Sequence, residues 1–546
     1  MTDAEHPDQP PAGDSTPEYL ESGGGAPAAA EPEPRPRRKR GLLLAGGGAL
    51  ALALAGGATA AALWYTSDGS QAAEAFPSTS VAYIGVTLDP SGQQKLEALE
   101  TLKKFPAISD KLGLDGSVSD IDVKEKIADA ILDSAPEGCD LTYADDIEPW
   151  LGDRFGVAVV PVDDKPQPVG AIEITDADKA EAGVKALTEC GGDASGDAGA
   201  TKVEGDWLLV GESSDILDSV ASQVDDGTLA DDSDFASITG EAGDQGIVTG
   251  YAAPAAGRYL TDLVQGELGS SSPLGGDASS QLSDQLEDFE GAALQARFSD
   301  GGLEVEAAGT IPQSALSGLS GAEKIGDKVT ALPDDTALVY GIGFGDDWLT
   351  TMLDQLGTMT GMSGDELDSQ LQSSAGVSVD QIQSAIGNGI VLAVGPDVDT
   401  DALTSGDLTA LPIALGVEGD QDDVEQLLYD LRPVLGPFAT PLTSTDEGDG
   451  LTVIGPDDTW RKAVAEGGDL GGNDTFSGVV NDAGDASGVL YLNFDALTQM
   501  LQGSPLGDMS ESQQVFDNLE PLSAIGMSAT RDGDTSHVMV RVSTDD

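Results

Sequence analysis

The sequence predicts an α+β protein with two tandem homologous domains, each with a mostly antiparallel sheet and flanking helices, preceded by a disordered tail and one transmembrane helix. Three observations lead to this prediction: an uncharged stretch near the N-terminus, a long internal repeat, and strand-like segments that alternate with helical ones. The chain has 546 residues, of which 97 are acidic and 25 are Lys or Arg, so its formal net charge is −72. Because such a chain offers no basic face to a polyanion, we expect no nucleic-acid partner.

The N-terminal region predicts a membrane anchor. Residues 1–34 are rich in Pro, Gly, Ala and acidic residues and should form a disordered cytoplasmic tail. The basic residues 35–40 precede the uncharged residues 41–63. A helix over this stretch would be about 34 Å long, enough to cross a bilayer core of about 30 Å. By the positive-inside rule the N-terminus is then cytoplasmic and everything after the span is extracytoplasmic, in the cell membrane topology of a single-pass signal anchor.

Two further features of this region leave alternatives open. A cleaved signal peptide is the alternative to an anchor, with residues 73–75 (Ala-Glu-Ala) as a small-x-small cleavage site. Small residues also recur every four positions along the span, which would let a second helix approach closely. The sequence therefore allows a homodimer through the helix face formed by Ala45, Ala49, Ala53, Gly57 and Ala61.

The rest of the chain contains a duplication, which is the most informative feature of the sequence. Residues 168–187 align without a gap with residues 412–431, and further blocks before and after them keep the same order. We therefore expect two homologous domains that are separated by a linker and preceded by another. Their predicted bounds are 76–313 and 332–546, with linkers at 64–75 and 314–331.

Periodicity predicts the elements of each copy. The apolar segment 80–88 is strand-like, residues 93–105 have helical spacing of Leu, and residues 154–162 and 168–174 are two strands joined by a Pro/Asp-rich turn. Asp176 and its counterpart Asp420 each follow a strand and open a helix, so we expect them to cap backbone N–H groups there. Further strands, a helix and a closing hairpin complete each copy, which favours an α+β fold on an antiparallel sheet.

The two cysteines both lie in the first copy. Cys139 lies in a segment that is longer than its counterpart in the second copy, and Cys190 follows the helix that Asp176 opens. In an oxidising compartment two thiols of one domain most simply pair. The sequence therefore predicts a Cys139–Cys190 disulfide.

The residues that carry chemistry are sparse. His6 lies in the tail and His537 alternates with valines in the last strand, so no Ser–His or Cys–His nucleophile can be assembled. We accordingly name no catalytic and no cofactor-binding residue, expect no cofactor, and favour a protein that is not an enzyme. A weak calcium candidate remains, because a D-x-D-x-D run resembles the start of a calcium loop but lacks its later Gly and Glu. This run is Asp397, Asp399 and Asp401.

Two segments carry a resemblance to a known family. These are AFPSTSVAYIGVTLDPSGQQKLEALETLKKFP, which begins at Ala75, and WLGDRFGVAVV, which begins at Trp150. With the basic cluster and the single apolar span before them, they resemble a family of actinobacterial single-pass exported membrane proteins that is known only as a domain of unknown function. The resemblance extends over residues 76–546 and implies a location and an architecture, but no catalytic residues.

These observations together favour a membrane-anchored extracytoplasmic protein that acts as a binding or scaffolding module of the cell envelope. Its partner would be an unidentified envelope protein or ligand. One alternative is a carrier of an apolar ligand such as a lipid, which would need a large apolar cavity. The other is a hydrolase that uses carboxylates alone, which would need two acids that converge in a cleft.

Overall fold

The computed structural model describes most of the chain after residue 70. The described residues are 71–87, 92–106, 109, 124–125, 128, 132, 141–190, 199–263, 286, 288–310, 321–346, 348–396, 398, 408–436, 444–502, 518–533 and 535–545. We call residues 71–310 half one and residues 321–545 half two.

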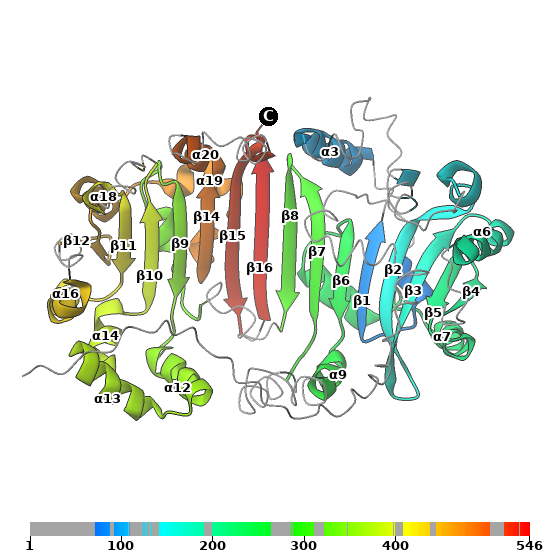
Figure 1. The fold of residues 1–546 in the computed structure, drawn as a ribbon, viewed down its shortest axis with the longest axis horizontal. Helices are drawn as coiled ribbons and strands as arrows, with labels where there is room; N and C mark the ends of the chain where they lie inside the picture. Colours follow the sequence, from blue (N-terminus) through cyan, green and yellow to red (C-terminus); the bar gives the residue numbers. More distant parts are fainter. Residues whose placement is uncertain are drawn as a thin grey trace, which may run out of the picture. The chain divides into compact units, whose positions relative to one another are not determined.

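A single antiparallel sheet of 16 strands organises both halves, and Figure 1 shows its strands side by side. The strands of half one are β1 (Ala82–Thr87), β2 (Leu151–Val162), β3 (Lys165–Ile174), β4 (Ala200–Glu204), β5 (Trp207–Gly211), β6 (Val248–Ala252), β7 (Ala292–Ser299) and β8 (Gly302–Gly309). Those of half two are β9 (Leu338–Gly343), β10 (Gly389–Val394), β11 (Ile413–Val417), β12 (Thr445–Gly448), β13 (Leu451–Ile454), β14 (Gly488–Asn493), β15 (Leu522–Asp532) and β16 (Thr535–Thr544).

The helical elements lie between these strands in the chain. Half one has η2 (Ala72–Ala75), α3 (Gly92–Lys103), η4 (Tyr143–Ile147), α6 (Ala177–Cys190), α7 (Ser214–Asp226), α8 (Ser233–Glu241) and α9 (Ala256–Leu263). Half two has α11 (Gly326–Thr330), α12 (Trp348–Thr360), α13 (Gly364–Ala375), α14 (Val379–Ile386), η6 (Leu408–Ala410), α16 (Gln421–Leu435), α18 (Asp458–Glu466), η8 (Leu470–Gly472), α19 (Asp474–Ser477), η9 (Ala483–Asp485) and α20 (Phe494–Gln502).

The two halves have the same strand order. From the outer edge inward, half one runs β4-β5-β3-β2-β1-β6-β7-β8 and half two runs β12-β13-β11-β10-β9-β14-β15-β16. The innermost strands β8 and β16 pair with each other in an antiparallel ladder. The prediction of two tandem domains with a sheet each is therefore wrong, since strand pairing continues from one half into the other. Sequence periodicity reports local elements and does not report a pairing between strands more than 200 residues apart.

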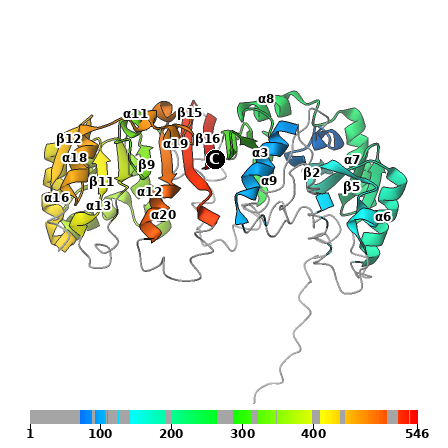
Figure 2. The same cartoon turned by 90° about the horizontal axis from the view of Figure 1, so that it is seen from above.

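Helices cover both faces of this sheet (Figure 2). On the first face, half one packs η2, α7 and α8 against side chains such as Tyr83 and Leu209, and half two packs α11, α18 and α19 against side chains such as Val391 and Tyr491. On the second face, α3, α6 and α16 pack against the strands of their own half. The strands alternate in which face each side chain occupies, so a single strand contributes to both cores.

Helices α6 and α16, which follow Asp176 and Asp420, differ in how their first backbone N–H groups are capped. Asp176 accepts a hydrogen bond from the backbone N–H of Lys179 at 3.1 Å, as an N-cap residue does. Asp420 occupies the N-cap position of α16 but its side chain caps no backbone N–H. The capping prediction is therefore confirmed for Asp176 and wrong for Asp420. Both α6 and α16 present an apolar face to the sheet, with Ala180 and Val424 buried.

Two other predictions need correction. Within the described residues, no helix combines the length and the apolar sequence that crossing a bilayer requires, so the transmembrane helix finds no support in the structure. The predicted span, residues 41–63, lies outside those residues, as does the tail before it. No disulfide is present in the described part either, and Cys139 lies outside it. The pairing of Cys139 with Cys190 is therefore not retained.

Candidate functional site

The line where half one meets half two carries a group of buried and half-buried charges. We call the paired strands β8 and β16 the seam (Figure 1). Five ionisable side chains gather on its first face, and we call them the seam charge cluster. They are Arg297 of β7, Glu304 and Glu306 of β8, and His537 and Arg541 of β16.

Half one contributes both carboxylates and one guanidinium group to the seam charge cluster. The Nη2 atom of Arg297 forms ion pairs with Glu304 and with Glu306. The side chains of Glu304 and Glu306 are only 6% and 7% exposed. The Nη1 atom of Arg297 donates to the backbone carbonyl of Asp244 at 3.1 Å, so this side chain also ties the end of α8 to the sheet. Charges this deeply buried need such partners, because each would otherwise lose its hydration without compensation.

Half two contributes the bases that face these carboxylates. The Nε2 atom of His537 lies 2.5 Å from the Oε1 atom of Glu306, and the Nη1 atom of Arg541 lies 3.6 Å from the Oε2 atom of Glu304. The Nη2 atom of Arg541 donates to the carbonyl of Ser299 at 3.2 Å. Its Nε atom is buried without a hydrogen-bond partner among the described residues. The contacts of Arg541 therefore cross the seam at the cost of one unsatisfied donor.

A glycine makes room for the cluster. Gly243, just after α8, has φ +79, and a Cβ atom there would lie 2.5 Å from an Oε atom of Glu306 and 3.1 Å from Nη1 of Arg297. A side chain at this position would be strained by the left-handed backbone and would collide with the ion pairs. The loop after α8 can therefore close over the charges only with glycine there.

The charges in the cluster stabilise one another. Burial would raise the pKa of Glu306, but the hydrogen bonds from His537 and Arg297 outweigh that effect and lower this pKa below its usual value. The hydrogen bond to Glu306 raises the pKa of His537, against the opposing effect of burial. A protonated His537 therefore faces an ionised Glu306 over the pH range between their two titrations.

This arrangement gives the seam a pH-dependent stability. Glu306 from β8, Arg297 from β7 and Asp482 from the loop before η9 are the charged groups that act on His537. The pKa of His537 is raised above 6.5, so its charged pair contributes in full below pH 6.5 and is lost as the pH rises through the folded-state pKa. The pKa of Glu306 is lowered below 4.5, so its contribution is present above pH 4.5 and is lost as the pH falls through its folded-state pKa.

We therefore expect His537→Gln to lower the thermal unfolding midpoint most between about pH 4.5 and about pH 6.5. The deficit should shrink as the pH rises further, because the wild-type histidine then loses its charge as well. Thermal unfolding of both proteins, followed by circular dichroism from about pH 5 to about pH 9, measures this difference. A deficit that stays constant over that range would contradict the ion pair.

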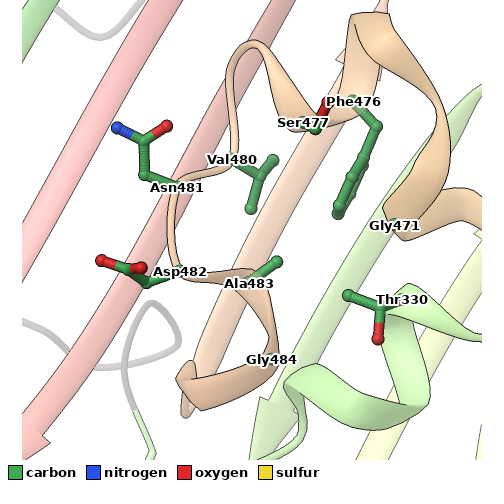
Figure 3. A pocket seen from close by; sticks show the side chains of 9 residues that line it. All are labelled: Thr330, Gly471, Phe476, Ser477, Val480, Asn481, Asp482, Ala483 and Gly484. Carbon is green, nitrogen blue, oxygen red and sulfur yellow. The ribbon is translucent and has the colours of Figure 1, made fainter.

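A surface hollow of about 470 Å³ lies beside the seam in half two (Figure 3). It is formed by the end of α11, η8, α19 and the loop that leads into η9. Figure 3 shows the side chains of Asn481 and Asp482 pointing away from that of Phe476. The lining residues are Thr330, Gly471, Phe476, Ser477, Val480, Asn481, Asp482, Ala483 and Gly484.

The hollow is connected to the seam by its polar side chains. The Nδ2 atom of Asn481 lies 2.7 Å from the sulfur of Met539, the β16 residue directly opposite Glu306. Asp482 has φ +48, a left-handed backbone that Asp adopts more readily than most residues. This turn presents the Asp482 carboxylate at an exposed position beside His537. The polar groups that line the hollow include this carboxylate, the amide of Asn481 and the hydroxyl of Ser477, and the apolar ones include Phe476.

The sequence predicted little of this site. It placed His537 in the last strand but did not predict its partner, a carboxylate of the other half, to which the 35% exposed side chain bonds. Asp397, Asp399 and Asp401, the weak calcium candidate, lie outside the described residues, as does the small-residue face that would form a homodimer. Within the described part, the seam included, no group of three or more His, Cys, Asp or Glu side chains is placed to hold a metal ion.

The comparisons with known proteins identify a family. Residues 42–384, more than half of the chain, match DUF3352, described as a protein of unknown function. The chain belongs to this family. The DUF3352 match runs through all of half one and into half two, as far as α14. No curated protein and no solved structure matches the chain.

Proposed function

We propose that the protein is a binding or scaffolding module of the cell envelope, in which the two halves form one platform and the hollow beside the seam receives a partner. The observation that carries this proposal is the continuity of the sheet through β8 and β16. Eight registered residue pairs join these strands, and buried ion pairs fix them on one face. A platform of this kind holds its surface loops in constant positions, as recognition requires.

The use of the buried charges supports binding over catalysis. Clusters of perturbed ionisable groups mark active sites when the groups face a cleft. In the seam charge cluster, Arg297 is held by two carboxylates and His537 by one of them. No described hydroxyl or thiol donates to His537, so its charge is used within the fold. No observation on the described residues favours the lipid carrier or the carboxylate-only hydrolase.

The net charge of −72 gives the module a preference among partners. A strongly acidic surface speeds encounter with basic partners and repels acidic ones. We accordingly expect the partner at the hollow to present a basic side chain to Asp482. Export of the globular part and an actinobacterial source also belong to this proposal, as predictions from the sequence.

A photo-crosslinking residue in the hollow tests the proposal in intact cells. Ser477 is exposed on the rim and directly follows Phe476. Ala236 is a matched control, because it is exposed and directly follows Phe235, which occupies the corresponding place in half one. We expect a discrete adduct from position 477 that Asp482→Asn weakens, and none from position 236.

Adducts at neither position, or equal adducts at both, would speak against a partner at the hollow. The location is tested separately with protease added to whole cells. If the protease cleaves the globular part only after the cells are lysed, the proposed location in the cell envelope is wrong. The hollow could then still be a binding site.

A further inference from the structure

The seam joins two strands that occupy the same place in their respective halves. In half one the last hairpin closes with Ser299 paired to Gly302, and in half two with Asp532 paired to Thr535. Counting four residues on from each closing pair shows that Glu306 of β8 corresponds to Met539 of β16. These two residues also lie directly opposite each other in the seam, so the local two-fold relation passes through this pair.

Because β8 and β16 occupy equivalent places in their halves, each of them has more than one strand with which it could pair. The edge of β8 could pair in the same way with β8 of a second copy, and β16 with β16, because the backbone pattern would be the same. A pairing of half one with half two differs from a pairing of the same half from two copies only in the side chains that face each other. The first face of the seam, where the charges lie, is therefore the place where such a distinction would be made.

The charges favour the unlike pair. In the seam, Glu304 lies directly opposite Arg541, and His537 lies opposite Ala308 within reach of Glu306. Both carboxylates of the seam charge cluster come from half one, and both basic side chains that approach them across the seam come from half two. Opposite charges on facing strands stabilise the pair, and like charges directly opposite each other destabilise it.

When the same register is applied to two copies of the same half, charges of the same sign come together. Two β8 strands paired about position 306 would place Glu306 opposite Glu306, both of them buried. Two β16 strands paired about position 539 would place His537 opposite Arg541 twice. Each like pairing thus faces charges of one sign across the ladder, which is a repulsive element against the wrong partner.

We propose that the seam charge cluster selects the partner of each half, so that half one pairs with half two of this chain and rejects the same half of a second copy. The first face of β8 is the recognition surface. It fits a strand that carries basic side chains at the positions of His537 and Arg541. The selection keeps the two innermost strands from joining separate copies edge to edge.

A charge-swap cycle at the directly opposed pair tests this selection in the full-length chain. Glu304→Arg places two guanidinium groups opposite each other, and Arg541→Glu places two carboxylates there, so that charges of one sign face each other across the seam. We expect each single variant to lower the unfolding midpoint and the double variant to recover much of the loss. Recovery should be incomplete, because Arg541→Glu also removes the bond to the carbonyl of Ser299, and because Glu304→Arg puts a second guanidinium group beside Arg297, the ion-pair partner of Glu304. Additive losses in the double variant would overturn the proposal.

Co-refolding the two single variants measures the partner choice itself. With one chain labelled by ¹⁵N, native mass spectrometry separates heterodimers from both homodimers. In the heterodimer, exchange of halves restores an unlike pair at both seams, so we expect it in excess of a statistical mixture. A statistical mixture, or no dimer, would overturn the proposal. The control is the same swap at Lys324 and Asp485, a surface pair at 2.5 Å whose side chains are 68% and 73% exposed, which should produce no dimers.

Discussion

Glu306→Ala should lower the free energy of unfolding by about 3 kcal/mol or more, because it removes the carboxylate that pairs with a largely buried Arg297 and a half-buried His537. The Glu306 side chain is 7% exposed and bonds to Arg297 of its own half and to His537 of the other. Without it, Arg297 keeps one of its two carboxylate partners, Glu304, and His537 loses the carboxylate that stabilises its charge. Chemical denaturation measures the loss, and hydrogen exchange should show the largest gain in exchange rate at β8 and β16.

Two variants separate this effect from general damage. Glu204→Ala removes a carboxylate of edge strand β4 that is 48% exposed and pairs with Lys202 at 3.4 Å, and it should cost less than about 1 kcal/mol. Glu306→Gln keeps the shape but not the charge, so it should fall between the wild type and Glu306→Ala. Equal losses from Glu306→Ala and Glu204→Ala would mean that the seam charge cluster contributes little to stability.

Local sequence patterns predicted many of the elements well. The strand-like segments 80–88, 154–162 and 168–174 correspond to β1, β2 and β3, and residues 93–105, with helical spacing of Leu, correspond to α3. These signals succeed because alternation and helical periodicity reflect which side of one element is buried. They carry no information on which strand lies next to which over long distances in the chain.

The seam was missed for that reason, although its residues left a trace. Residues 303–306 alternate apolar and acidic side chains, and residues 537–541 alternate basic and apolar ones with a methionine between. Each pattern alone is typical of a strand with one solvated face. Read together, an acidic face on the last strand of one copy and a basic face on the last strand of the other suggest that the two strands pair.

Phe235→Ala should be at least as destabilising as Glu306→Ala, because it opens a cavity in the first-face core of half one. Phe235 is 4% exposed and packs edge-to-face on Tyr83 and Tyr251, with ring centroids 5.7 Å and 5.0 Å apart. Truncation of a buried Phe costs about 3 to 5 kcal/mol, and the aromatic pairs add roughly 1 kcal/mol each. Chemical denaturation of the full-length chain measures the total.

The corresponding residue of half two provides the comparison. Phe476 is 1% exposed and lines the hollow, but among the described residues it contacts a single aromatic ring, that of Tyr491 at 5.1 Å. Phe476→Ala should therefore destabilise the chain by about 1 kcal/mol less than Phe235→Ala, the value of one aromatic pair. Phe235→Leu, which keeps most of the volume, should recover most of the loss. If both alanine variants lost the same amount, the second aromatic contact of Phe235 would add nothing, and burial alone would account for the stability that each phenylalanine provides to its half.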